Sequence, residues 1–370
     1  MSNTDSFGST SPPQKAPSHR SKKKSTRKTL IILLAVIAVI GLVTPQVVSR
    51  LSGAPDFPGP GSGSVQVQIA SGETLAQIGN SLKSLGVVAS VDGFIAAAND
   101  NPESGSIAPG LYNLLLEMKS SDAILALLDP ANRVVTRVVI PEGKRVSWII
   151  NTLATETGIP LADFESAVTK ANELGLPDYA GGNAEGFLFP ATYEFGPGTT
   201  AEQIIGEMIA RFNVEAKSID LEARAAQMGR TAYEIVIVAS LLEGEGQPRD
   251  FAKVAQVVYN RLAEPMRLQF DSAVNYGLGI ADVLLTTELL NTPTDYNVYL
   301  NDGLTPTPIN NPGGLALVAA LNPESGDWLY FITTDLLTTE TKFTRSYEEF
   351  LVFKDELLAF CDVNPDVCYQ

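Results

Sequence analysis

Two glutamates at the end of an apolar segment are the residues of this chain best placed to do chemistry. Glu243 and Glu245 follow TAYEIVIVASLL (231–242), whose apolar side chains cover nearly every face of a helix and so predict a buried one. Burial disfavours an ionised carboxylate, and so does the negative end of the helix dipole. Both effects raise the pKa of Glu243 toward the range that a general acid needs near neutral pH. Gly244 and Gly246 are expected to end the helix as left-handed caps. The alternative for the two carboxylates is that they only lie on a solvated helix end.

Histidine and cysteine are too scarce for several other kinds of site. The only histidine is His19, in a basic tail, which excludes a Ser-His-Asp triad, a Cys-His pair and a histidine-based zinc site from the folded part. Cys361 and Cys368 are the only cysteines and are not a metal site. They either close a small loop in an oxidising exterior or remain free thiols. We expect no metal and no cofactor.

The charge of the chain is unevenly distributed. The 370 residues are 45% hydrophobic, which is enough for two or three compact domains, and the formal net charge is −16. Residues 1–28 contain seven Lys/Arg and one acid, whereas the remaining 342 residues carry 19 basic and 41 acidic side chains. So acidic a main body excludes nucleic acid as its expected partner.

An apolar run near the N-terminus predicts a membrane anchor. LIILLAVIAVIGLV (30–43) has no polar side chain, and residues 29–48 just reach the roughly 20 residues that span a bilayer. The basic tail 1–28, which we expect to be disordered, would then lie in the cytoplasm and everything after the anchor outside the cell membrane. A cleaved signal peptide is the alternative. Residues 49–64 are rich in Pro, Gly and Ser and predict a flexible tether.

The rest of the chain predicts an α+β fold in two parts. IASGETLAQIGNSL (69–82) and IPEGKRVSWIINTL (140–153) share one pattern, which predicts two strand–glycine turn–helix units or a chance recurrence of a common one. A small module is expected at 65–133, a larger α+β domain at 134–360 and a tail at 361–370. Further elements are predicted as a strand at 111–118 and helices at 91–99, 120–129, 146–157, 161–173, 200–213 and 218–228.

Seven ordered blocks within about 65–355 resemble the YceG-like family of endolytic murein transglycosylases. The resemblance implies a single transmembrane helix, a LysM-like glycan-binding module at 65–133 and a transglycosylase domain at 134–360. The blocks are EGFLFPATYEF (185–195), ASLLEGEG (239–246), VYNRL (258–262), LQFDSAVNYGLG (268–279), YNVYLNDGLTPTPINNPG (296–313), ALNP (320–323) and WLYFI (328–332).

The resemblance places the family's catalytic acid at Glu243. It implies cleavage of the β-1,4 bond between N-acetylmuramic acid and N-acetylglucosamine without water, closing a 1,6-anhydro ring, so that no second carboxylate is needed as in a hydrolase. Glu245, two residues on, would point elsewhere and give secondary support. Glu185 and Tyr193 would support the acid from behind. The residues expected on a turn and beside a proline-rich loop to bind substrate, each with packing as the alternative, are Gln269, Asp271, Asn275, Tyr276, Tyr296, Asn297 and Tyr299.

Two positions depart from the family pattern. Lys342, in TETKFTRS (339–346), replaces a histidine that the family usually carries, and Gly244 replaces a large or charged residue between the two glutamates. The implied partners are peptidoglycan glycan strands, the membrane and peptidoglycan synthases. The alternative functions are a non-catalytic peptidoglycan-binding anchor or scaffold and a true muramidase.

Overall fold

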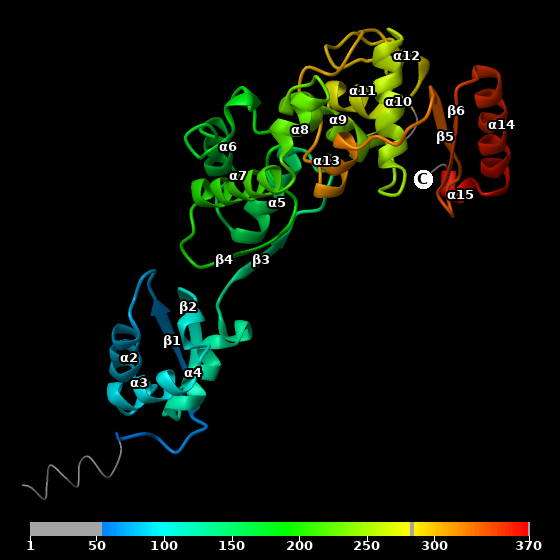
Figure 1. The fold of residues 1–370 in the computed structure, drawn as a ribbon. Helices are drawn as coiled ribbons and strands as arrows, with labels where there is room; N and C mark the ends of the chain where they lie inside the picture. The colour runs from blue at the N-terminus through cyan, green and yellow to red at the C-terminus, as the bar shows by residue number, and fades with distance from the viewer. Residues whose placement is uncertain (1–53, 282–284, 369–370) are drawn as a thin grey trace, which may run out of the picture. The chain divides into compact units, whose positions relative to one another are not determined.

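The computed structural model describes residues 54–281 and 285–368, which form a mixed α and β fold as predicted (Figure 1). The basic tail expected at 1–28 and the membrane helix expected at 29–48 lie outside these residues. Among the helices of the described ranges, none is long and apolar enough to cross a membrane. The chain divides into two units after Arg133, and each is described separately.

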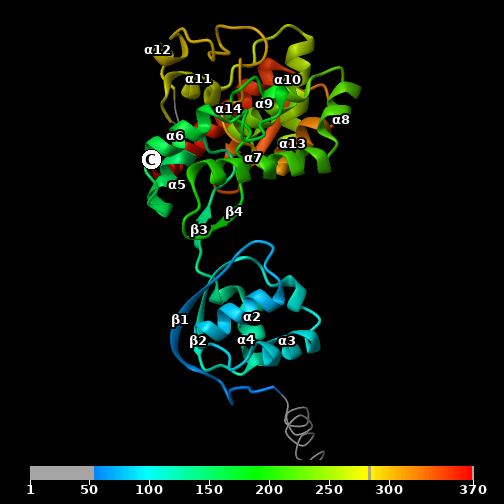
Figure 2. The same cartoon turned by 90° about the vertical axis from the view of Figure 1, so that its left-hand side faces the viewer.

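The first unit is a two-stranded antiparallel sheet with three helices on one side of it (Figure 2). Val67 and Ile69 alternate with exposed residues and face the helices, as does Tyr112 on the other strand. Its elements are β1 (Ser62–Ile69), α2 (Leu75–Ser84), α3 (Val91–Asp100), β2 (Gly110–Leu116) and α4 (Ser120–Leu128).

Part of the expected tether is docked on this unit. The backbone N–H and the hydroxyl of Ser120 donate to Oδ1 of Asp56 at 2.9 and 2.8 Å, and the hydroxyl of Ser90 donates to the carbonyl of Pro55 at 2.6 Å. The N-cap of α4, Lys119, makes no capping bond of its own. Asp56 therefore caps α4 from 64 residues away in the sequence, a cap worth about 1 kcal/mol.

The second unit is mainly helical, with two small antiparallel sheets, β3 with β4 and β5 with β6. Helix α14 packs along the β5–β6 hairpin at one end of the unit (Figure 1). The elements are β3 (Thr136–Val139), α5 (Val146–Thr157), α6 (Leu161–Thr169), β4 (Thr192–Phe195), α7 (Ala201–Ser218), α8 (Leu221–Gln227), α9 (Ala232–Glu245), α10 (Phe251–Ala263), α11 (Asp271–Leu278), α12 (Thr287–Leu290), α13 (Gly314–Leu321), β5 (Tyr330–Asp335), β6 (Glu340–Thr344), α14 (Tyr347–Val363) and α15 (Pro365–Cys368).

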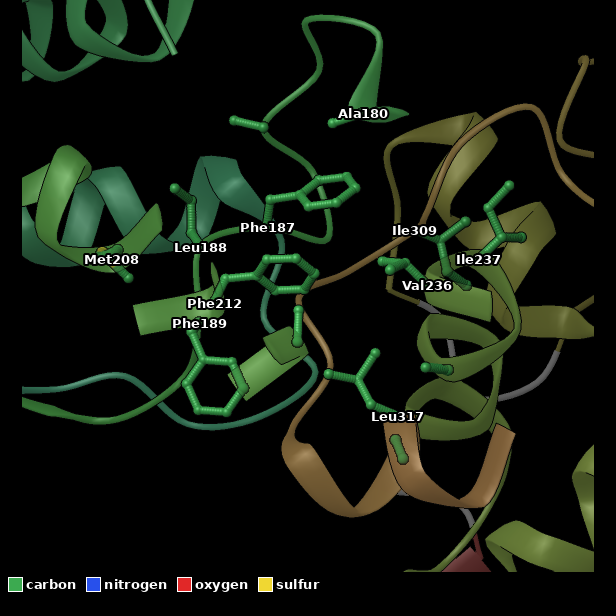
Figure 3. Packing of buried hydrophobic residues seen from close by; sticks show 14 of the residues in the cluster. Ala180, Phe187, Leu188, Phe189, Met208, Phe212, Val236, Ile237, Ile309 and Leu317 are labelled. Carbon is green, nitrogen blue, oxygen red and sulfur yellow. The ribbon is translucent and has the colours of Figure 1, made fainter. Parts of the chain in front are cut away.

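Helix α9 is buried as its composition predicts. Thr231 and Glu234 form a capping box at its start, and every residue from Ile235 to Leu242 is buried. Figure 3 shows Val236 of α9 in the same cluster as Phe187 and Phe212. The rings of Phe187 and Phe212 meet edge to face at 4.8 Å. The glutamates at the C-terminal end of α9 thus follow directly on a helix that is fixed in the core.

Both predicted strand–glycine turn–helix units are present. Gly72 and Gly143 lie between β1 and α2 and between β3 and α5, with φ of +80° and +71°. These left-handed conformations suit glycine because a Cβ would strain them. Boundaries elsewhere differ from prediction: α6 ends four residues early, and α7 runs to Ser218 before the chain turns at Asp220, whose φ is +53°.

Three local expectations needed correction or resolution. Gly244 lies inside α9, and Gly246 has an extended φ of −127°, so the predicted left-handed caps are wrong. The last turn closes instead through the N–H of Gly246 donating to the carbonyl of Leu242. Asp271, Asn275 and Tyr276 lie on a helix, α11, rather than on a turn. Of the two alternatives for the cysteines, the structure has the disulfide, which joins α14 to α15.

Candidate active site

The carboxyl group of Glu243 lies half-buried between two glycine-containing loops. Its Oε1 accepts a hydrogen bond of 2.9 Å from the backbone N–H of Gly313, the N-cap of α13. Gly143 approaches from the β3–α5 loop, where a Cβ would stand 3.6 Å from the Glu243 Cβ and 3.9 Å from Oε2. Because residue 143 is glycine, no side chain lies against the second carboxyl oxygen from this loop.

Burial raises the pKa of Glu243 from 4.5 to about 7. The hydrogen bond from Gly313 opposes this rise because it stabilises the ionised form. The negative charge of Glu142, an exposed residue next to Gly143, adds to it. A carboxyl group that is half protonated near neutral pH can give a proton and take one back in the same reaction.

Ser240, three residues before Glu243, fastens the loop that carries Gly313 to helix α9. Its buried hydroxyl donates to the carbonyl of Ile237 at 2.8 Å and accepts from the N–H of Ile309 at 3.1 Å. The Ser240 carbonyl accepts from Nδ2 of Asn310 at 2.8 Å. The loop and the carboxyl group of Glu243 are therefore held by the same helix.

Asn311 joins this loop to two other segments, and it has no exposed surface. Its Nδ2 donates to the carbonyl of Lys144 and to Oε1 of Glu185, both at 2.9 Å. Its Oδ1 accepts from the N–H groups of Gly186 at 3.0 Å and Leu188 at 2.8 Å. One amide thus fixes the β3–α5 loop, the 185–188 segment and the loop before α13 around Glu243.

Glu185 lies behind this arrangement and is 6% exposed. Besides Asn311, it accepts hydrogen bonds from the N–H of Val146 at 3.0 Å and the hydroxyl of Tyr276 at 3.3 Å. Burial raises its pKa to about 7, against these hydrogen bonds and the charge of Arg145. Since both of its oxygens are engaged inside the protein, Glu185 positions the surrounding loops rather than meeting substrate.

Glu245 serves a different place from Glu243. Its Oε1 accepts from the N–H of Ser272 at 3.0 Å, and burial raises its pKa to about 7. It lines a cavity of about 460 Å³ together with Gln269, Asp271 and Tyr299. The two glutamates therefore point to different neighbours, as expected for residues two apart on a helix.

Metal ligands are not gathered in the ranges the structure describes: no three or more His, Cys, Asp or Glu side chains come together in a way that could hold an ion.

Comparisons with known proteins agree on one family. The model of the YceG-like family matches residues 67–356. The chain belongs to the YceG-like family.

Relatives with names and a solved structure support this membership. The endolytic murein transglycosylase of Bacillus subtilis (strain 168) is 30% identical over 312 residues, covering 80% of this chain and 85% of the relative. That of Streptococcus pneumoniae serotype 2 is 29% identical and covers 72% of this chain and 54% of the relative. A crystal structure of a YceG-like protein from Listeria monocytogenes has 27% identity and a TM-score of 0.53, covering 78% of this chain and 98% of that one.

The substrate-binding residues predicted from the YceG-like blocks fall into two groups. Gln269, Asp271 and Tyr299 line the cavity beside Glu245, where the Tyr299 hydroxyl donates to Oδ1 of Asp271 at 2.6 Å. Tyr276 and Tyr296 instead meet edge to face at 4.8 Å on the side of Glu185. Tyr276 and Tyr296 are therefore not part of the lining of the cavity beside Glu245.

Of the remaining predicted residues, Asn297 and Tyr193 make hydrogen bonds that support the fold. Asn297 has no exposed surface, and its Nδ2 donates to the carbonyls of Leu290 and Thr292, so it shapes the loop of this YceG-like block. Asn275 is half-buried on α11. Tyr193 is buried on β4 and donates to the carbonyl of Phe189 at 2.6 Å, a packing role within its own segment.

The structure shows the surroundings of Gly244 and Lys342, the two residues that depart from the family pattern. A Cβ on Gly244 would lie 2.7 Å from the Cβ of Ser272, so this chain packs α11 too closely against α9 for any side chain there. Lys342, at the position of the usual histidine, forms an ion pair with Glu356 of α14.

Proposed function

We propose that this chain is an endolytic murein transglycosylase in which Glu243 is the catalytic acid and base. The Bacillus subtilis relative that carries this name covers most of the chain. The observation that supports the residue assignment is the half-buried carboxyl group at the end of α9, with a pKa raised to about 7 and no side chain of residue 143 against Oε2. Glu243 is also the first acid of the family block.

The reaction needs only this group and the substrate. Protonated Glu243 gives its proton to the glycosidic oxygen that leaves with N-acetylglucosamine, and the bond from that oxygen to C1 of the muramoyl ring breaks. The C6 hydroxyl of the same ring attacks C1 and gives its proton to the Glu243 carboxylate. A 1,6-anhydro ring forms, the acid is regenerated and no water enters the products. The Gly313 N–H holds Oε1, so Oε2, beside Gly143, is the oxygen that faces substrate.

Glu185 and Glu245, whose pKa burial also raises to about 7, are weaker candidates for the acid. Both oxygens of Glu185 are hydrogen-bonded inside the protein. Glu245 lines a cavity, but its position in the family block is the second acid, and the N–H of Ser272 holds one of its oxygens. Replacing each of the three in turn decides between them.

The membrane and wall-binding parts of the proposal rest on the sequence and on two structural features. We infer that residues 29–48 anchor the chain with its N-terminus in the cytoplasm and its two units outside. The disulfide Cys361–Cys368 supports an oxidising compartment. The strand–helix–helix–strand order of residues 62–116 supports a LysM-like module that binds N-acetylated glycans. Peptidoglycan synthases are the partners that fit this placement.

Product analysis tests the function. Purified residues 54–370 are incubated with peptidoglycan, and the soluble fragments are analysed by mass spectrometry. We expect 1,6-anhydro ends, each lighter by one water than a reducing end. Reducing ends would indicate a muramidase, and binding without cleavage would indicate an anchor or scaffold.

The residue assignment is tested with isosteric variants. Glu243→Gln is expected to lower the rate by about a thousandfold or more, because the glutamine neither gives nor takes the proton, while binding to peptidoglycan is kept. The matched control is Glu156→Gln, an exposed position on α5, which should cleave at the wild-type rate. Turnover retained in Glu243→Gln and lost in Glu245→Gln would move the acid to Glu245.

A further inference from the structure

We propose that the cavity beside Glu245 binds a sugar ring of the glycan strand. This ring lies beyond the bond that is cut at Glu243. The β5–β6 hairpin and α14 form a wall of the cavity. The inference rests on the proposed function and extends it to a substrate subsite. The cavity of about 460 Å³ lies within the usual range for small-molecule sites. Its lining includes Glu245, Arg261, Gln269, Tyr330 and Tyr347.

A buried cation faces this cavity. Arg261 is 6% exposed, and its Nε and Nη1 donate to the backbone carbonyls of Leu329 and Leu268. These bonds use two of the five N–H groups of a guanidinium. Among residues 54–281 and 285–368, Arg261 forms no ion pair, because no carboxylate oxygen lies within 4 Å of its guanidinium nitrogens. The charge of Glu245 and the rings of Phe270 and Tyr330, 5.8 and 5.6 Å from the guanidinium carbon, offset part of the cost of burying this charge. The N–H groups that the two carbonyls do not use make Arg261 a donor for a polar ligand in the cavity.

Three aromatic rings form one side of the cavity. Tyr330 of β5 lies 5.5 Å from both Tyr347 and Phe350 of α14, measured between ring centroids. Tyr347 is 53% exposed at the start of the helix, although it is a large aromatic side chain. Aromatic faces beside hydrogen-bonding groups suit a pyranose, whose C–H faces pack on rings while its hydroxyl and acetamido groups bond at the edge.

The charges of the cavity favour a neutral sugar over an acidic peptide. Asp271 and Glu245 line it with Arg261, so a carboxylate-bearing ligand would meet two acids as well as one base. Hydroxyl and amide groups can use all three, since they both donate and accept. An uncharged N-acetylated sugar is therefore the occupant that the lining fits.

The backbone at the rim carries strain of the kind found at binding sites. Gln269 has a φ of +51°, a left-handed conformation that is strained for a residue other than glycine. Its N–H donates to the carbonyl of Val298 at 3.1 Å, which holds this conformation in place. Gln269 is exposed and lines the cavity, so the strained turn presents an amide side chain where a sugar would bind.

Glu243 and Glu245 end the same helix, so a strand that places its scissile bond at Glu243 can reach the cavity with a neighbouring sugar. Such a subsite is filled only when the glycan strand extends past the bond that is cut. A requirement of this kind favours internal cleavage of long strands over removal of terminal units.

Footprinting tests the site without any need for turnover. The full chain carrying Glu243→Gln is exposed to hydroxyl radicals with and without hexa-N-acetylchitohexaose, and oxidation of Tyr347 is quantified by mass spectrometry. We expect the oligosaccharide to lower Tyr347 oxidation about threefold or more, as coverage of a half-exposed ring would. Unchanged oxidation at saturating oligosaccharide overturns the proposal. Protection by a free stem peptide but not by the oligosaccharide also overturns it, in favour of a peptide site.

Kinetics on long strands provides the second test. Tyr347→Ala removes an exposed ring, so the fold is expected to survive, and Tyr347→Phe keeps the ring as the matched control. For long strands we expect Tyr347→Ala to raise KM about tenfold with little change in kcat, whereas Tyr347→Phe stays within about twofold of wild type. Equal KM for all three overturns the subsite. If the wild-type chain gives no anhydro products, the proposed function fails, and the footprint still decides whether the cavity binds sugar.

Discussion

The backbone N–H of Gly313 donates a hydrogen bond of 2.9 Å to Oε1 of Glu243, across 70 residues of sequence. Gly313 is the N-cap of α13, so the positive end of that helix faces the carboxyl group. Burial pushes the proton onto Glu243, and this contact pulls in the opposite direction. The balance keeps the pKa near 7 instead of higher, which is the range in which one group can act first as acid and then as base.

The first prediction concerns the charge of Glu142. The rate requires protonated Glu243, so it should fall about tenfold per pH unit above the pKa of about 7. Glu142 disfavours ionisation of Glu243, and Glu142→Gln should therefore move this alkaline limb to lower pH. Glu142 is exposed and its field is screened, so we expect a shift of a few tenths of a unit. Rates measured from pH 5 to 9 at low salt give the limb, with Glu156→Gln as control. A limb moved to higher pH would contradict the charge effect.

The second prediction concerns Asn311. Asn311→Ala leaves the N–H groups of Gly186 and Leu188 without their buried partner and removes one of the two hydrogen bonds to Oε1 of Glu185. At about 1–3 kcal/mol for each unsatisfied group, we expect the free energy of unfolding to fall by about 3 kcal/mol or more. Calorimetry should show a Tm about 5–10 °C lower for a unit of this size. Asn151→Ala, on the exposed face of α5, serves as control and should change Tm little. An unchanged Tm in Asn311→Ala would show that the three segments do not depend on this amide.

The third prediction concerns Glu185 and the pH dependence of stability. Its pKa is about 7 in the folded protein against an ordinary value of 4.5, so the folded state binds more protons between these values. The stability contributed by this group is full below about pH 4.5 and is lost as pH rises through 7. Glu185→Gln cannot ionise and should lose less stability than wild type between pH 5 and pH 8. Unfolding curves at pH 5 and pH 8 give the free energy of unfolding of each protein. If this free energy changed equally with pH in both proteins, Glu185 would be excluded as a source of the pH dependence.

The fourth prediction concerns the close approach of α9 and α11. Gly244→Ala places a Cβ 2.7 Å from the Cβ of Ser272, so α11 must move and the Ser272–Glu245 hydrogen bond is strained. We expect a loss of about 1–3 kcal/mol in stability and a lower rate. Ser272→Gly removes the opposing atom but keeps the N–H that Glu245 accepts. The double variant should therefore recover most of the loss. A double variant no better than Gly244→Ala would disprove the steric cause.

The sequence predicts well where one segment determines its own environment. The apolar run 231–242 forms a buried helix whatever packs on it, and the direction of the Glu243 pKa follows from that alone. The helix predicted at 146–157 has these bounds in the structure, after a glycine turn at Gly143. In both cases the hydrophobic period and the turn residue lie within about 15 residues of each other.

The sequence predicts poorly where the partners are distant. The contacts of Asn311 with Gly186 and Lys144 span 125 and 167 residues, and nothing local separates its amide from that of any other loop asparagine. The predicted left-handed caps were wrong for a related reason, because Gly244 is required by Ser272 across the packed helices and not by a turn. Tyr347 was missed as part of the cavity because it comes to line the same cavity as Arg261 only after the hairpin folds back.

The cap that Asp56 places on α4 limits how far the first unit can stand from the bilayer. If residues 29–48 span the membrane as proposed, the chain leaves it after Val48 and is already docked at Pro55. The six residues 49–54 between them reach about 20 Å at full extension. The part of the predicted tether that precedes the docked residues is thus far shorter than the whole segment 49–64. With the proposed anchor in the bilayer, so short a segment would keep the first unit close to the membrane surface.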